Sequence, residues 1–283
     1  MRFQGQGVLH EGSVNLTAGA GRKLFTAIFN FTTDTVTVAE LEARKLHHDS
    51  TELLTRAVQP ALWLLIFGEV LAQIRGIPTG QISYMDFMTP GILAQSVLFI
   101  AIFYGIAVIW ERDLGIVHKM LASPAPRAAL VLGKALSASE RGLSQAVIVY
   151  LLALLIGVHI NWTLPAVLAV VLVVILGSAL FSTFSLIIAC LVRTRERFMG
   201  IGQLLTMPLF FASNAIYPVS IMPSWLQAIS EVNPLTYEVD ALRSLMVIGG
   251  VSVYGFAVDL AALLAAIAVL VIVAARLYPR VAV

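Results

Sequence analysis

The sequence predicts an all-α integral membrane protein with six transmembrane helices, an amphipathic interfacial helix near the amino terminus, a cytoplasmic helix and outer re-entrant helices. Three observations predict this fold class. Hydrophobic residues make up 59% of the 283 residues and charged residues only 12%, roughly half the charged share of a soluble domain. Six apolar segments are each long enough to cross about 30 Å of hydrocarbon. A compact charged segment, 110–134, separates two of these apolar runs.

Before the first span, the sequence predicts a tail and a helix lying on the membrane surface. Residues 1–33 begin with a stretch rich in Gly, Ser and Gln and lack a secretory signal, so we expect a flexible cytoplasmic tail. Residues 34–54 should form the interfacial helix, because Ala43 and Leu46 share an apolar face while Glu40 lies elsewhere. Residues 55–283 then make up a single transmembrane domain.

The six expected spans follow one another along this domain. They are residues 57–74, 91–110, 143–160, 164–192, 198–217 and 251–275. The fourth is longer than a bilayer requires, so we expect it to tilt or to project beyond the membrane.

The positions of lysine and arginine indicate how the spans are oriented. All but two of the 18 lysines and arginines precede the first span, connect spans two and three or four and five, or follow the last span. The exceptions are Arg75 and Arg243. Cytoplasmic connections carry the excess of positive residues. We therefore expect both termini in the cytoplasm and the chain in the inner, or plasma, membrane.

The segment 110–134 predicts a short amphipathic helix outside the bilayer core. Over 111–122, Leu114, Val117 and Leu121 recur at helical spacing among polar residues. The helix is too short to cross the bilayer, and Pro124 and Pro126 should end it. The pattern leaves two roles open, a surface gripped by a partner and a passive helix resting on lipid headgroups.

On the outer side, the long connection 218–250 predicts two further short helices. Apolar residues, including Trp225 and Leu242, alternate with polar ones, and a break is expected at Asn233 and Pro234. We expect these helices to enter or cap the outer leaflet.

A search for chemistry indicates that the chain is not an enzyme. Gly133 and Lys134 resemble the end of a phosphate loop, but Ala128 replaces its first glycine and Ala135 follows the lysine. The single cysteine, Cys190, cannot form an intrachain disulfide, and the histidines are not placed to share a metal. Clustered positive charge on a soluble domain, expected of a nucleic-acid-binding protein, is also missing. We therefore expect no catalytic, metal or cofactor site in this chain.

Six residues within the spans are candidates for a transport pathway or gate. Charged groups in a membrane segment are costly and often functional, which selects Glu69 and Asp259. Aromatic residues could line a route for an apolar molecule, which selects Phe99, Phe103, Phe210 and Phe211. Structural or interfacial roles for the two acids, and core or lipid-facing roles for the aromatics, remain open.

Three separated motifs resemble one family of transport proteins. The run PGILAQSVLFIAIFYGIAVIWERDLGIVHKMLASPAPRAALVLGKAL (90–136), the segment SNAIYPVSIMPSWLQAISEVNPLTYEVDALRSLM (213–246) and the QPALWLLIFGEVL entry into the first span are similar to ABC-2 type permeases. The likeness is greatest to the daunorubicin-resistance and nodulation-export branch. It covers roughly residues 40–276 and does not select a substrate.

The resemblance implies partners and a role for the segment 111–122. Family members pair as homodimers or heterodimers and bind two separate ABC ATPase subunits, which hold the ATP and Mg that this chain would not bind. The family's coupling helix, which docks on the ATPase, matches 111–122, with Glu111, Arg112 and Gly115 as its ERxxG element. The expected ATPase-coupling residues are Glu111, Arg112, Gly115, Val117, His118 and Leu121.

The resulting expectation is a permease subunit of an ATP-driven exporter. It would move an amphipathic drug, antibiotic or lipid-like molecule out of the cytoplasm or the inner leaflet. Export of a glycolipid or polysaccharide is the alternative within the family. An ATP-independent secondary transporter would predict internal repeats or several charged groups buried at mid-membrane, and the sequence indicates neither. A membrane-embedded enzyme would need a convergent catalytic set.

Overall fold

The computed structural model describes residues 33, 57–73, 77–122, 126–192 and 194–278. The predicted tail and interfacial helix, apart from residue 33, lie outside the described residues. In the described part the chain is helical, and its one isolated β-bridge joins Ile160 to Val247. The all-helical prediction is therefore confirmed.

Four helices are long and apolar enough to cross a membrane: α4 (Tyr84–Asp113), α6 (Arg127–Ile156), α7 (Leu164–Leu191) and α11 (Phe256–Leu277). Two other expected spans are shorter. The apolar helix Ala57–Ala72, which includes η1 (Trp63–Gly68) and α3 (Glu69–Ala72), is followed by residues outside the described part, and α8 (Arg195–Phe211) has 17 residues. Six spans remain a prediction.

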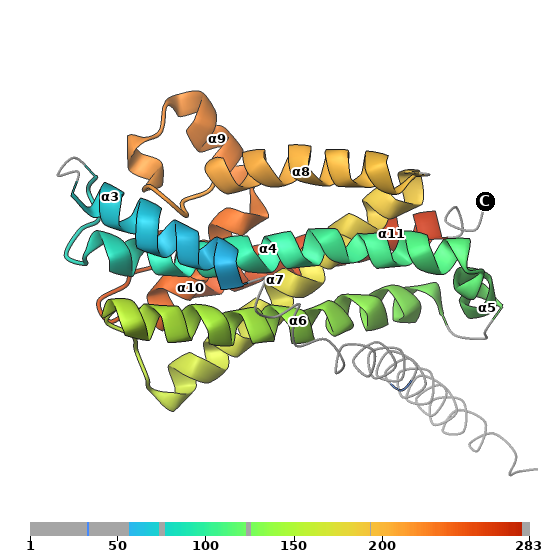
Figure 1. The fold of residues 1–283 in the computed structure, drawn as a ribbon, viewed down its shortest axis with the longest axis horizontal. Coiled ribbons are helices and arrows are strands. Elements are labelled where there is room, and N and C mark those ends of the chain that lie inside the picture. Colours follow the sequence, from blue (N-terminus) through green and yellow to red (C-terminus); the bar gives the residue numbers. More distant parts are fainter. Residues whose placement is uncertain (1–32, 34–56, 74–76, 123–125, 193, 279–283) are drawn as a thin grey trace, which may run out of the picture.

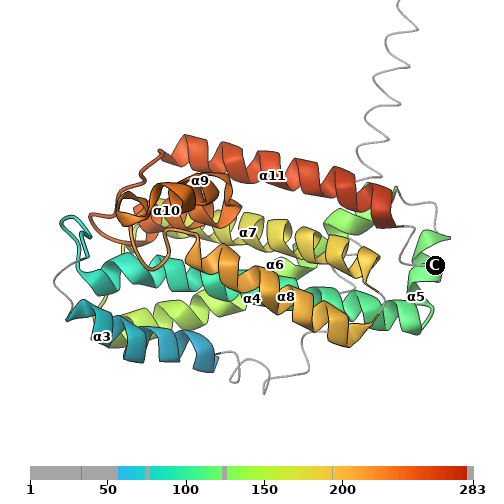
Figure 2. The ribbon, with the colours of Figure 1, turned by 90° about the horizontal axis from the view of Figure 1, so that it is seen from above.

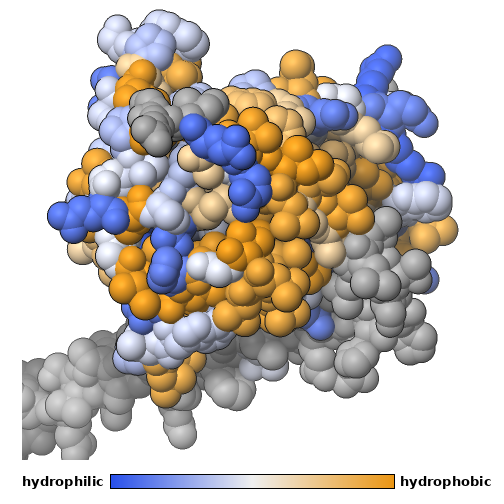
Figure 3. Space-filling model, turned by 60° about the vertical axis from the view of Figure 1, so that its left-hand side comes forward, coloured by the Kyte–Doolittle hydropathy of each residue, from blue (hydrophilic) through white to orange (hydrophobic). Residues whose placement is uncertain are grey.

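Helices α4 and α7 form the centre of the bundle. α4 packs against α6, α7, α8 and α10, and α7 packs against α6, α10 and α11. Figure 2 shows α11 along one side of the bundle and α3 on the opposite side. Large apolar side chains are exposed on the outer helix faces, as contact with lipid requires, and Figure 3 shows one broad apolar face. Examples are Leu155, Leu168, Leu204 and Val269.

The bundle has two distinct ends (Figure 1). We call one the α5 end, because α5 (Ile116–Leu121) follows α4 there. The other is the His159 end, where the backbone N–H of His159 donates to Asp86 at 2.9 Å and Ile160 bridges Val247. The positive connections predicted between spans two and three and between spans four and five lie at the α5 end.

Several helices begin or end away from the positions that hydropathy predicts. α6 starts at Arg127 rather than 143, because buried polar residues such as Ser137 and Ser139 pack inside the protein instead of facing lipid. α6 ends at Ile156 and is capped by Gly157, whose φ of +84° suits glycine. α8 ends at Phe211 rather than 217, one turn after Pro208.

The segment 218–250 contains the two expected short α-helices and, before them, one 3-10 turn. η2 (Val219–Ile221) precedes α9 (Ser224–Val232), and α10 (Pro234–Met246) follows. They separate at Asn233, whose side chain accepts a hydrogen bond from the Leu235 N–H and caps α10. α10 packs against α4, α7 and α11 and is therefore largely buried.

Candidate functional site

The segment 111–122 is not the single helix that the sequence predicted. α4 continues through Asp113, and the chain then turns before α5 begins at Ile116. The turn includes Gly115, whose φ of +72° is unfavourable for residues with a Cβ. Helical spacing could not indicate this break. Glu111 and Arg112 consequently belong to the last turn of α4, and α4, the turn and α5 form an elbow.

Val117 fixes α5 against the bundle. Its side chain is fully buried in an apolar cluster that contains Ile109, Leu130 and Tyr278. Leu114, which was expected on the same apolar face, is 68% exposed because it lies in the turn. The side chains of His118 and Leu121 lie outside the described part, so their predicted coupling role remains a prediction.

A buried ion pair braces the elbow. The Lys134 ammonium of α6 donates to the Glu111 carboxylate of α4, and the two side chains are 3% and 8% exposed. The Lys134 carbonyl accepts from the Ser137 hydroxyl at 2.8 Å, and Ser137 also bonds Tyr104. Lys134 is therefore a packing residue of the helix interface, which agrees with the rejection of a phosphate loop.

Surface charges connect the elbow to the start of α8. Asp113 lies 3.1 Å from Arg112 and 2.9 Å from Arg195, and the Arg195 guanidinium lies 3.3 Å from the centre of the Trp110 ring. Arg112 also donates to the Val192 carbonyl at 3.4 Å. α4, α5, α6 and α8 thus form one connected unit at the α5 end, with Leu114 at its surface.

The structure does not gather the six pathway candidates in one site: the four aromatic residues form two pairs, and the two acids lie apart. The rings of Phe99 and Phe103 lie 6.2 Å apart, and those of Phe210 and Phe211 lie 5.3 Å apart. Phe210 is fully buried and Phe211 is 43% exposed. The remaining two candidates are acids: Glu69 is exposed on α3, and Asp259 is buried at the start of α11.

An apolar groove lies between α8 and α9. Its volume is about 780 Å³, within the range of small-molecule pockets. Phe211, Tyr217 and Trp225 contribute aromatic surface, and Asn233 contributes an amide. A second apolar groove of about 540 Å³ reaches α7 and α11. Both are lined by Leu209, Val232 and Pro234.

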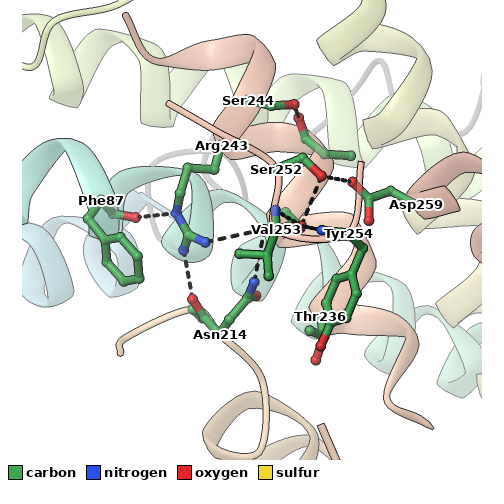
Figure 4. Close-up of polar contacts among 12 residues, drawn as sticks. Phe87, Asn214, Thr236, Arg243, Ser244, Ser252, Val253, Tyr254 and Asp259 are labelled. Atoms are coloured by element: carbon green, nitrogen blue, oxygen red, sulfur yellow. Dashed lines mark hydrogen bonds and ion pairs between the residues drawn. The ribbon is translucent and has the colours of Figure 1, made fainter. Parts of the chain in front are cut away.

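Buried polar groups join α10 to α11 at the His159 end (Figure 4). The Asp240 carboxylate accepts from the N–H groups of Val253 and Tyr254 at 2.6 and 3.1 Å and from the Ser252 hydroxyl at 3.0 Å. The Ser252 hydroxyl also lies 2.8 Å from Asp259, which is fully buried. Asp259 is therefore shielded from water, and Ser252 is the polar contact of its carboxylate within the described part of the protein.

Arg243 extends this network to α4. Its guanidinium donates to the carbonyls of Asn214 and Phe87 at 2.6 and 3.2 Å, stacks 3.8 Å from the centre of the Phe87 ring, and lies 3.8 Å from Asp240. Asp240 and Arg243 of α10 are thus buried together at the His159 end. These residues were assigned to an outer connection, and hydropathy does not indicate that such a segment is buried.

Comparison with known proteins identifies the family. The model of the ABC-2 type transporter family matches residues 34–247. The chain belongs to this family of membrane permeases. The matched region contains the elbow, the groove between α8 and α9, and α10, and it ends before α11.

The relatives of this permease are transport proteins. It is 29% identical to the putative transport permease ycf38 of Cyanophora paradoxa over 68% of this chain and 67% of the relative. It is 25% identical to the daunorubicin resistance ABC transporter permease protein DrrB1 of Streptomyces coeruleorubidus over 70% of each chain. The inner membrane transport permease YadH of Escherichia coli is 24% identical over 74% of this chain and 82% of YadH.

The described part of the permease offers no metal centre, because no three metal-ligating side chains gather there. Its distinctive features are the elbow at the α5 end, the grooves beside α9 and the buried charges of α10. Sequence reasoning located the elbow and the aromatic Phe211. It missed Asp240, Arg243 and Glu238, although acidic and basic residues one helical turn apart in 234–246 could have suggested a buried pair.

Proposed function

We propose that this permease is the membrane subunit of an ATP-driven exporter and that its elbow receives the movement of a separate ATPase. The proposal is supported mainly by the way in which the elbow is held against the bundle while part of its surface stays exposed. The Glu111–Lys134 pair and buried Val117 fix it from within, while Leu114 and Lys119 remain exposed for a partner. A segment that is firmly attached to the bundle can transmit a push, whereas a loose loop cannot.

Movement of the elbow would reach the rest of the bundle through α4. This helix is continuous from Tyr84 to Asp113 and packs against α6, α7, α8 and α10. A shift at its α5 end can therefore alter helix contacts as far as the His159 end. ATP and Mg would be bound by the partner ATPase, and the movement requires that the elbow contact the ATPase differently in its two nucleotide states.

The substrate we propose is an amphipathic small molecule, such as a drug, an antibiotic or a lipid-like compound. The groove between α8 and α9 supports this, because its lining is almost wholly apolar and its aromatic residues can cover a flat or branched apolar body. A polysaccharide would instead need many polar contacts along its path. The assembly would contain a second permease, identical or related, and two ATPase subunits.

The α5 end would face the cytoplasm. Lys119, Arg127, Arg195 and Arg197 lie there, and such residues accumulate on the cytoplasmic side. The His159 end, with α9 and α10, would then face outward.

The test is to purify the full chain with its associated proteins, identify any ABC ATPase, and measure ATP hydrolysis in proteoliposomes. Leu114→Asp should abolish ATPase binding and stimulated hydrolysis, because it places an unpaired charge in the proposed contact. Ile248→Asp is the matched control, since Ile248 is 62% exposed at the opposite end. An active complex containing Leu114→Asp would refute the elbow as the ATPase contact.

Substrate class can be measured in the same proteoliposomes with a panel of amphipathic drugs, phospholipids and a glycolipid. Uptake of drugs or phospholipids that requires ATP would support the proposal. Uptake confined to the glycolipid would support the alternative cargo. Transport that proceeds at full rate without an ATPase would refute the ATP-driven mechanism.

A further inference from the structure

Glu238 is a buried acid. It has no role in the proposed coupling to an ATPase, and it does not line the proposed substrate groove. It lies on α10, and its exposed fraction is zero. Neither carboxylate oxygen has a hydrogen-bond partner in the described part of the protein. An ionised carboxylate is strongly disfavoured in such surroundings, because no donor replaces the water it has lost.

The carboxyl group fills a space that α7 provides. A Cβ atom built on Gly177 would lie 2.0 Å from Glu238 Oε1. The acid is therefore packed directly against the α7 backbone, near the middle of a helix that runs from Leu164 to Leu191. The whole of α7 contains no aspartate, glutamate, lysine, arginine or histidine, so it provides no counter-charge. Its single ionisable side chain, Cys190, lies at its α5 end.

The ionisable groups of the other surrounding helices have different partners or positions. On α10 itself, Asp240 and Arg243 belong to the network at the His159 end, and the Tyr237 hydroxyl donates to the Glu231 carbonyl at 2.6 Å. On α11, Asp259 bonds Ser252, and Arg276 lies in the last turn.

On α4, the ionisable groups are held at sites away from Glu238. The Tyr84 hydroxyl donates to the Ile216 carbonyl at 2.9 Å, Asp86 bonds His159, and Tyr104 bonds Ser137. Glu111, Arg112 and Asp113 form the charged groups of the elbow. On α9, Glu231 is exposed. On α6, which contacts α7 near Gly177 through Ser139, Glu140 is a further acid and Arg141 stacks on the Tyr104 ring. No ion pair joins Glu238 to any of these groups in the described part of the protein.

The surroundings of Glu238 indicate which kind of ligand its carboxyl group can bind. A metal ion would need several oxygen or nitrogen ligands, and the described residues contain no group of three that could hold one. An organic cation would need a cavity beside the carboxyl group, and Glu238 lines neither of the two described grooves. A proton needs neither additional ligands nor additional space.

We propose that Glu238 is a proton-binding site at the contact between α7 and α10. The carboxyl group carries a proton while the two helices are packed, and it releases that proton to water when α10 separates from α7. The packed arrangement is then favoured at lower pH, where the proton is available. At higher pH it is weakened, because the ionised carboxylate favours separation and hydration.

The first experiment measures the proton itself by infrared spectroscopy of the purified full-length chain in lipid nanodiscs at neutral pH. The wild-type spectrum minus that of Glu238→Gln should contain a carboxylic-acid C=O stretching band. Glu231→Gln, which removes the exposed acid of α9, should leave that band unchanged. Glu238→Met provides a second uncharged replacement of similar size. If neither Glu238 variant loses the band, Glu238 is ionised and the proposal is overturned.

The second experiment measures whether the proton stabilises the helix contact. The unfolding temperature of the wild type should fall from neutral to alkaline pH by more than that of Glu238→Gln or Glu238→Met. The Glu231→Gln control should follow the wild type. Equal falls in all four proteins would overturn the link between protonation and packing. Both measurements are independent of transport, so their failure would leave the proposed exporter function untouched.

Discussion

Glu111 and Lys134 form an ion pair that joins the last turn of α4 to the second turn of α6, with both side chains almost inaccessible to water. The pair closes the elbow from inside, while the chain between its two partners forms α5. Both residues lie in the charged segment 110–134 that the sequence singled out, Glu111 in the expected helix and Lys134 in the false phosphate-loop match. The pair thus fixes the geometry of the elbow, and the ATPase contact that we propose would involve the exposed residues of the turn.

Removing one partner should therefore destabilise the protein strongly. Glu111→Ala leaves the Lys134 ammonium buried without its counter-charge, which costs about 3–5 kcal/mol for such pairs. The free energy of unfolding can be measured by SDS titration in mixed micelles. Replacing both residues by methionine should recover most of the loss, because an apolar pair of similar volume has no unpaired charge. Asp113→Ala, in an exposed pair with Arg195, should have a much smaller effect. Equal losses for Glu111→Ala and Asp113→Ala would contradict this assignment.

Gly115 should be required for the turn of the backbone between α4 and α5, and not because a larger side chain would collide with its neighbours. Its φ is +72°, and a Cβ built there would meet no atom within 4 Å. Gly115→Ala should cost roughly 1–2 kcal/mol of backbone strain and favour a straight extension of α4. Limited proteolysis of 113–116 and the unfolding free energy would both report the change.

Gly200 provides the matched control for this substitution. It lies in α8 with an ordinary helical φ and also has free space around its Cβ position. Gly200→Ala should be neutral or stabilise the protein by about 0.5–1 kcal/mol. If the two alanine variants changed the free energy of unfolding equally, the positive φ of Gly115 would not contribute to the effect of its substitution.

Asp240 should control the turn that leads into α11. Three hydrogen bonds converge on its Oδ2 atom, from Ser252, Val253 and Tyr254. Asp240→Ala removes the acceptor of these partly buried donors, which should cost roughly 1 kcal/mol for each hydrogen bond lost. Hydrogen–deuterium exchange at the amides of Val253 and Tyr254 should accelerate. Ser244→Ala removes only a local bond to the Ala241 carbonyl and should leave these amides protected.

The order of the helices could be predicted from sequence because it depends on apolar run length and on Pro and Gly positions. The break at Asn233 and Pro234 illustrates this, since a capping side chain and a proline act locally. The burial of α10 could not be predicted in this way. Whether Glu238 faces lipid, water or Gly177 depends on which helices surround it, and that is a property of the whole bundle.

The candidate site shows the same limit. The residue types in 111–115 indicated a polar segment outside the membrane, and the structure places it at the end of the bundle. The division into α4 and α5 depends on one backbone dihedral at Gly115, which helical periodicity does not report. Phe99, Phe103, Phe210 and Phe211 were grouped by residue type alone. Spacing along separate helices does not determine which of them share a surface, and Phe211 is the one that lines the groove between α8 and α9.

Filling that groove should reduce transport of bulky amphipathic molecules without disturbing the elbow. Ala228 is exposed on α9 and lines the groove opposite α8. In Ala228→Phe, the added ring occupies space that the apolar part of a substrate would need, so transport in proteoliposomes should fall several-fold while ATPase binding is retained. Ala261→Phe is the matched control, since Ala261 is exposed on α11 and belongs to neither described groove. If Ala228→Phe transported bulky drugs at the wild-type rate, the groove would not be the path or binding surface of the substrate.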